Sequence, residues 1–434
     1  MPARWVPLLY LAFAHLSLAA ALATLVATPR SLAGYYYHPR MLAVVHLVTL
    51  GWITMSILGA LYVVGPIALR MPMPAGRADL FAFGSVATGI IGMVAHFWIE
   101  EFGGMAWSGM MVAAGILYVG CRVMRGLRQA PIHGAVKLHV RFAFANIAAA
   151  ATAGVLLGFD KVYHFLPGFV LSNVLAHAHL AAIGWASMMV VGVAHQMLPM
   201  LLPARPTHGK TMYASAILLQ TGATGLFVTL ILQSEWVTLF AAATVAGFVA
   251  FAGHVGQMLR HRARPAIGLP AANYAIRHVF LALGFLVITS VIGMLLAAWD
   301  MSEVTLRLAL AYGVFGLVGF LAQIVFGVQL RLLPLLAWFT ATPNTANLRD
   351  HGSPHAVPST RLATVSFILW LWGVPALAVG FAVDGIPLLT AGALALEAGV
   401  MIGVIQAVRA ARYAFGARPG RMVSQQQSIR RAIA

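Results

Sequence analysis

The sequence contains very little charge for its length. Only 9% of its 434 residues are charged, whereas 61% are hydrophobic. A soluble protein of this size could not bury so much apolar surface, so the composition excludes a soluble globular protein. It is typical of a protein that crosses a lipid bilayer many times.

Cysteine is almost absent, since Cys121 is the single one. This excludes an internal disulfide and a Cys-x-x-Cys metal site. It also excludes covalent haem attachment through a Cys-x-x-Cys-His sequence. Any haem in this protein would be held by non-covalent ligands alone.

Acidic residues are also few, with 10 against 27 basic residues and a net charge of +17. Lysine and arginine accumulate in cytoplasmic loops, so this excess needs no nucleic-acid partner. With both termini in the cytoplasm, the outer loops hold only Arg30, Arg40, Lys161 and Arg307. We therefore expect an integral protein of the plasma membrane of a bacterium, with both termini cytoplasmic. The basic tail, 412–434, would rest on anionic lipid.

Twelve apolar stretches are long enough to cross a bilayer, which takes about 20 residues per helix. They predict an all-α integral membrane protein with a single transmembrane domain, 1–434. The first stretch exceeds the apolar core of a signal peptide, and we interpret it as a retained helix. The stretches are 5–27, 42–68, 79–99, 104–124, 138–158, 170–201, 211–232, 236–258, 275–298, 305–336, 362–383 and 386–411.

A sequence motif repeats along the chain. The first copy contains His46, Gly51, Trp52, Met55, Gly59 and Pro66, and the second contains His179, Gly184, Trp185, Met188, Gly192 and Pro199. A third copy without the histidine contains Val314, Gly319, Phe320, Gln323, Gly327 and Pro334. The motif falls on the second helix of each group of four, which predicts three pseudo-repeated four-helix units, about 1–130, 131–265 and 266–434.

Histidines inside a bilayer are costly and indicate function. His46, His96, His177 and His179 are all predicted in the outer half of the membrane. His46 and His179 are repeat equivalents at matched depth, the arrangement of a bis-histidine haem iron. His177 lies about 200° around the helix from His179, so the two would serve neighbouring sites, or one would serve a site while the other packs. For the other buried histidines we expect hydrogen bonds inside the bundle: His15, His139, His195, His254 and His278.

The run His177-Ala-His179-Leu-Ala-Ala-Ile-Gly184-Trp185 resembles the haem-ligating helix of subunit I of haem–copper oxidases. It is most similar to the C-type enzymes, and twelve helices in three arcs is that superfamily's architecture. The resemblance implies non-covalent haem b, with His179 as a low-spin haem ligand and His46 binding from the other side. It implies that His177 is a ligand to a second haem. Arg40 is the local candidate for a haem propionate partner.

The sequence departs from this family at several positions. Val314 stands where the family has a histidine on helix 10, and the stretch 211–232 lacks the family's copper-binding histidines. Copper is therefore not favoured. The only acid that we place deep in a helix is Glu397, which argues against a proton-pumping oxygen reductase.

The resemblance implies oxidoreductase-like electron transfer in respiration, or the binding or reduction of a diatomic gas such as O2 or NO. No catalytic residue is assigned. The electron donor would be quinol or a separate protein, and a small partner subunit is compatible with the sequence. Two alternatives remain open. One is a catalytic site that holds copper or non-haem iron with His46, His96 and His177, and the other is a haem-free membrane transporter of a metal or small solute.

Overall fold

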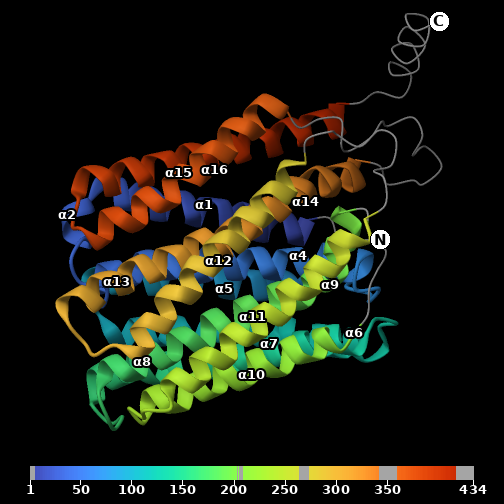
Figure 1. Cartoon of the computed structure of the whole chain (residues 1–434). Coiled ribbons are helices and arrows are strands. Elements are labelled where there is room, and N and C mark those ends of the chain that lie inside the picture. The colour runs from blue at the N-terminus through green and yellow to red at the C-terminus, as the bar shows by residue number, and fades with distance from the viewer. Residues whose placement is uncertain (1–4, 203, 205–208, 263–272, 342–358, 417–434) are drawn as a thin grey trace, which may run out of the picture.

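The chain forms an all-helical bundle in the computed structural model, which describes residues 5–202, 204, 209–262, 273–341 and 359–416 (Figure 1). The described ranges contain no β-strand and twelve helical spans that are long and apolar enough to cross a membrane. The prediction of an all-α, twelve-helix membrane protein is thereby confirmed. The loop histidines His351 and His355, and residues 417–434 of the basic tail, lie outside the described residues.

Within the described ranges, nine spans are single α-helices. A short helix, α2 (Pro29–Leu32), follows the first of them. The nine are α1 (Trp5–Ala27), α5 (Arg77–Ile99), α6 (Phe102–Gln129), α7 (Gly134–Tyr163), α10 (Lys210–Ile231), α11 (Val237–Arg260), α12 (Tyr274–Ala298), α15 (Thr360–Ala382) and α16 (Ile386–Gly416).

The other three spans each contain a π-helical segment between two α-helices. They are the spans that carry the repeated motif. The second span is α3 (Pro39–His46), η1 (Leu47–Thr54) and α4 (Met55–Ile67). The sixth is α8 (Val170–His179), η2 (Leu180–Ser187) and α9 (Met188–Leu201), and the tenth is α13 (Glu303–Gly313), η3 (Val314–Ala322) and α14 (Gln323–Ala341).

The three π-helical segments meet inside the bundle, where each contacts the other two. The indole Nε1 of Trp52 donates to the carbonyl of Ala322 in η3 at 3.2 Å. The indole Nε1 of Trp185 donates to Thr54 Oγ1 in η1 at 3.1 Å. Both indoles are buried, where an unpaired N–H would be costly. The tryptophans of the motif therefore join the three central spans.

The motif glycines make equivalent close contacts with the first helix of each predicted unit. A Cβ added to Gly59 would stand 2.7 Å from Cβ of Tyr10, and one added to Gly327 would stand 2.7 Å from Cβ of His278. One added to Gly192 would overlap Cβ of His139. Small residues let helices approach this closely in a membrane. The same kind of contact thus recurs once in each of the three predicted units.

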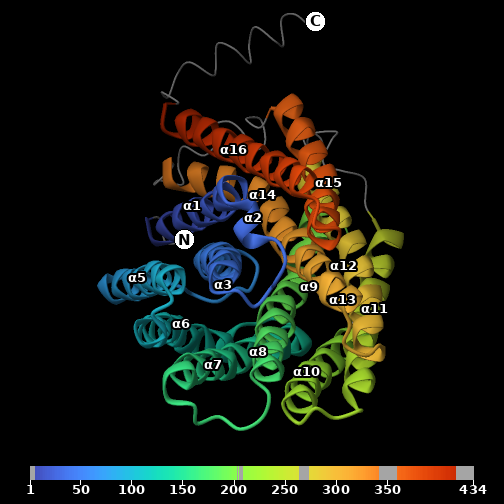
Figure 2. The same cartoon turned by 90° about the vertical axis from the view of Figure 1, so that its left-hand side faces the viewer.

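The helices of the three predicted units occupy different sectors of the bundle when it is viewed end-on. In Figure 2, α3, α5 and α6 lie on the left, α7, α8 and α10 lie below, and α12, α15 and α16 lie to the right and above. The end where α1 finishes and α3 begins is called the His46 end below. The opposite end, where α5 begins, is called the Asp79 end.

Candidate functional site

His46 and His179 occupy the same local position in their spans, because each ends an α-helix directly before a π-helical segment. The Nδ1 atom of His46 donates to the carbonyl of Leu42 at 2.7 Å, and that of His179 donates to the carbonyl of Leu175 at 2.8 Å. A carbonyl can only accept, so Nδ1 carries the proton and Nε2 of each neutral ring carries the lone pair. This is the tautomer that binds metal through Nε2.

His177 is a part-buried ring on α8 that faces α7. Its Nδ1 donates to the carbonyl of Ala150 on α7 at 2.9 Å, which again leaves the lone pair on Nε2. Gly154 on α7 makes room for the ring, since a Cβ there would stand 2.9 Å from Cε1 of His177. The ring of His177 is thus held against α7 with its Nε2 lone pair available.

His179 faces a different helix from His177, as their spacing of two residues predicts. Its Nε2 accepts a hydrogen bond from the Tyr312 hydroxyl of α13 at 3.2 Å, and the two rings stack with centroids 6.0 Å apart. Tyr312 stands two residues before Val314, so the third span supplies a phenol near the position where its histidine is missing. The sequence analysis did not identify Tyr312.

The polar contacts of His96 are with residues at or just after the C-terminal end of α5. Its Nδ1 donates to the carbonyl of Gly92 at 2.6 Å, and its Nε2 lies 3.6 Å from the Glu101 carboxylate. Its neighbour Phe97 packs against the His46 ring, with centroids 5.0 Å apart. As the side chains stand, no group of three or more His, Cys, Asp or Glu among the described residues is arranged to hold a metal ion. The predicted set of His46, His96 and His177 is therefore not assembled as a three-ligand site.

Arg40 lies one and a half helical turns before His46 on α3. Its guanidinium stacks over the Trp98 ring, 5.3 Å from the centroid. Its Nε atom is buried and has no hydrogen-bond partner among the described residues. Lys161 lies over the rings of Tyr37 and Phe102, at 4.5 Å and 4.8 Å. Two cations therefore border the His46 end, and an anion could pair with Arg40.

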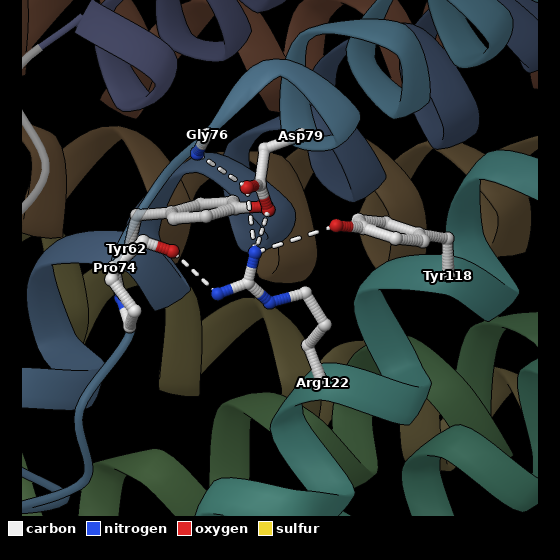
Figure 3. A network of polar contacts seen from close by, with 6 residues as sticks. All are labelled: Tyr62, Pro74, Gly76, Asp79, Tyr118 and Arg122. Carbon is white, nitrogen blue, oxygen red and sulfur yellow. Dashed lines mark hydrogen bonds and ion pairs between the residues drawn. The ribbon is translucent and has the colours of Figure 1, made fainter.

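The sequence analysis missed a polar network at the Asp79 end. Asp79 is fully buried, although Glu397 was the only acid predicted deep in a helix. Its carboxylate accepts hydrogen bonds from the Tyr62 hydroxyl at 2.7 Å and from Gly76 N at 2.7 Å, and it pairs with Arg122 at 2.6 Å (Figure 3). Arg122 also donates to the carbonyl of Pro74 and to the Tyr118 hydroxyl. Every oxygen of Asp79 is satisfied, so this network is a structural ion pair.

Three histidines gather in the second unit at the same end. His139 on α7, His195 on α9 and His254 on α11 are 0%, 3% and 0% exposed. The ring centroids of His139 and His195 are 5.2 Å apart, and those of His195 and His254 are 4.8 Å apart. The sequence analysis expected each of them to make hydrogen bonds separately. Their convergence depends on packing of α7, α9 and α11, which no local pattern reveals.

Comparison with known proteins does not assign the chain to a family. No protein-family model matches the chain, and a search of curated proteins finds no significant match. The resemblance of residues 177–185 to haem–copper oxidases therefore rests on the motif and the helix count alone.

Proposed function

We propose that the chain is a membrane electron-transfer protein that binds haem b at the His46 end. The observation that carries the proposal is the pair His46 and His177. Both rings are part-buried at the His46 end, and both have Nδ1 fixed by a backbone carbonyl. The structure gives neither Nε2 a hydrogen-bond partner among the described residues. Two lone pairs are thus available to an iron.

The second axial position has two candidates. Nε2 of His177 holds no hydrogen bond among the described residues, whereas Nε2 of His179 accepts one from Tyr312. Binding through His179 would break that bond and leave a part-buried phenol without its partner, which is unfavourable. We therefore place His177 opposite His46 and revise the initial pairing of His46 with His179. In this proposal, the Tyr312 hydroxyl holds His179 beside the site.

The position of Arg40 supports the same location for the haem. Its buried Nε lacks a partner among the described residues, and its stacking on Trp98 fixes the guanidinium near the start of the second span. A guanidinium binds a carboxylate through paired hydrogen bonds. Arg40 would therefore bind a propionate. Phe97 would keep the His46 ring in its orientation and exclude water from that side.

Haem bound here would supply an iron that gains and loses one electron. If His46 and His177 both held the iron, no position would be left for a gas, so these residues would support electron transfer better than the binding or reduction of O2 or NO. The described residues at this end include no acid that pairs with His46 or His177 to deliver protons. The electron donor in this proposal is quinol or a separate protein, and the setting is the plasma membrane of a bacterium.

The test replaces one ligand and one matched histidine. His46→Ala should abolish the reduced-minus-oxidised absorbance band of the purified protein, because it removes the ligand that the proposal needs most. His15→Ala is the control. His15 is also part-buried on a neighbouring helix, its Nδ1 donates to the carbonyl of Leu11 at 2.8 Å, and its ring packs on Trp52. The control should keep the full band.

The second axial ligand is decided by two further variants. His177→Ala should convert the spectrum to a five-coordinate form that shifts when carbon monoxide is added, whereas His179→Ala should leave the band in place. The opposite result would restore His179 as the axial ligand. A full band in His46→Ala would contradict the proposal.

A further inference from the structure

An apolar cavity lies between the three spans that carry the repeated motif, on the Asp79 side of their π-helical segments. Its volume is about 100 Å³, and its walls come mainly from α4, α9 and α14. Its layers consist of residues at equivalent positions of the motif, since Met189 follows Ser56 by 133 residues and Ile324 follows Met189 by 135. The cavity therefore runs along the line where the three spans meet. The layer nearest the Asp79 end consists of Val64, Met197 and Leu332.

The cavity is narrow and elongated. On α4 its wall extends from Ser56 to Val64, eight residues further on, which is about 12 Å at 1.5 Å per residue. An apolar cavity of about 150 Å³ in another protein holds a benzene ring. A volume of about 100 Å³ that extends over this length is too narrow for a ring, and it suits an unbranched chain.

Two polar side chains, Ser56 and Gln329, interrupt the apolar wall in the part of the chain that the structure describes. Gln329 stands in a layer whose other members are Leu61 and Ala194. Its Nε2 donates to Ser56 Oγ at 2.8 Å, and both residues are buried. Its amide oxygen, Oε1, is also buried and has no hydrogen-bond partner among the described residues. One acceptor in an apolar cavity thus lacks a donor.

The unpaired oxygen of Gln329 limits what the cavity can hold. A buried acceptor without a partner is costly, and such atoms in native proteins are almost always paired. A buried water makes about three hydrogen bonds, and this cavity offers it too few partners because Ser56 and Gln329 already bond to one another. A plain hydrocarbon would leave the oxygen unpaired. A hydroxyl group on an apolar chain supplies the donor, and the chain fills the remaining space.

We propose that this cavity binds one unbranched aliphatic alcohol, whose hydroxyl group donates to Oε1 of Gln329. Side chains of a helix lean towards its N-terminus, so Gln329 reaches back to Ser56 and the polar pair lies at the inner end of the cavity. The chain of the alcohol then extends towards the Asp79 end. Met189 and Met197 line its path, and methionine adapts its shape to an apolar partner.

This site is separate from the one proposed for haem. Ser56 lies ten residues beyond His46, which is roughly 15 Å along the span at 1.5 Å per residue. The hydrogen bonds of Trp52 and Trp185 join the three spans between the two sites. An alcohol in the cavity would therefore leave His46 and His177 free to bind an iron.

The test photolabels the full-length protein in detergent micelles. The probe is an analogue of 1-octanol with a diazirine group on its chain, and tandem mass spectrometry locates the label. The label should appear on the cavity wall of α9, at Met189, Val193 or Met197, and excess 1-octanol should suppress it. Heptyl methyl ether is an isomer of 1-octanol that cannot donate a hydrogen bond. It should compete about tenfold less effectively, because it leaves the oxygen of Gln329 unpaired.

Gln329→Leu removes the acceptor, and a leucine already stands at the equivalent position of α4, Leu61. In this variant the advantage of 1-octanol over the ether should fall below about twofold. Gln323→Leu is the matched control. Gln323 is also buried on α14, and its amide oxygen also has no partner among the described residues, but it is not part of the cavity wall. The control should keep the advantage of the alcohol.

Equal competition by the alcohol and the ether in the wild-type protein would overturn the proposal, and this comparison does not require any variant to fold. Label confined to residues outside the cavity would also overturn it. So would an equal loss of the alcohol's advantage in Gln323→Leu and Gln329→Leu. Because the label is located without reference to haem, failure here and failure of the haem proposal are distinguishable.

Discussion

The first and second units place different chemistry at equivalent positions of the Asp79 end. Tyr10 packs on Gly59 in the first unit and His139 packs on Gly192 in the second, and His195 stands 133 residues after Tyr62. In the first unit, the acid Asp79 accepts hydrogen bonds from Tyr62 and Gly76 and pairs with the base Arg122. Both of its carboxylate oxygens therefore have partners. The second unit contains imidazoles, with three unpartnered nitrogens.

This difference separates a network in which the carboxylate of Asp79 is fully paired from a cluster with unpartnered nitrogens. A buried ion pair is stabilising only when each charge has its partner, and the Asp79 network meets that condition within the chain. Neutral imidazoles have no partner of opposite charge to satisfy them. The comparison therefore predicts that the first cluster is sensitive to the loss of any member, whereas the second tolerates replacement of its unpartnered His195 ring by an apolar one.

The largest effect is expected from Asp79→Ala. This substitution leaves Arg122 without its counter-ion and the Tyr62 hydroxyl without its acceptor, and breaking a buried pair costs about 3–5 kcal/mol of the free energy of unfolding. Unfolding in mixed micelles with increasing SDS measures the cost. Glu303→Gln is the control because it breaks the exposed Arg307–Glu303 pair, 2.7 Å long, which should cost at most about 0.5 kcal/mol. Equal effects in the two variants would contradict the structural role of Asp79.

A smaller effect is expected from Gly192→Ala. The added methyl group would overlap Cβ of His139, so α7 and α9 must separate, and such overpacking costs about 1–3 kcal/mol. Gly253→Ala is the matched control on α11, since its added Cβ would meet nothing within 4 Å. The control should be neutral or slightly stabilising. If the two alanine variants unfold at the same SDS concentration, the close contact between the two helices is not as described.

The smallest expected effect comes from a comparison of Tyr62→Phe with His195→Phe, one substitution in each cluster. Tyr62→Phe removes one hydroxyl that donates to Asp79 and should lower the free energy of unfolding by about 1 kcal/mol. His195→Phe replaces two unpartnered nitrogens by carbon, and should leave the free energy unchanged or raise it. The pair is measured in the same micelles. A larger loss for His195→Phe than for Tyr62→Phe would show that His195 has partners within the chain.

The fold was predictable from sequence because a bilayer restricts the structure to apolar helices of known length. The span 170–201 was predicted with its ends at Val170 and Leu201, as the structure has them. The motif of Gly184 and Trp185 was also visible. The π-helical segments were not, since hydrophobic periodicity does not distinguish them from an α-helix.

The site was predictable only in part. The depths of His46, His177 and His179 follow from counting residues along a helix, and so does the divergence of His177 from His179. Which helix each ring faces depends on packing between distant segments. The hydrogen bonds of His177 with Ala150 and of His179 with Tyr312 therefore could not be predicted from the sequence. Asp79 was missed because it lies in the first turn of its helix, where an acid is ordinarily solvated.

The central claim concerns the His46 end and is tested most directly by one spectrum. A dithionite-reduced minus oxidised absorbance spectrum of the purified wild-type protein should show the sharp band of a b-type haem. That band should be unmoved by carbon monoxide, because in the proposal His46 and His177 would both hold the iron. A band that shifts with carbon monoxide would contradict the six-coordinate assignment. Absence of haem from protein purified under haem-sufficient conditions would contradict the proposal as a whole.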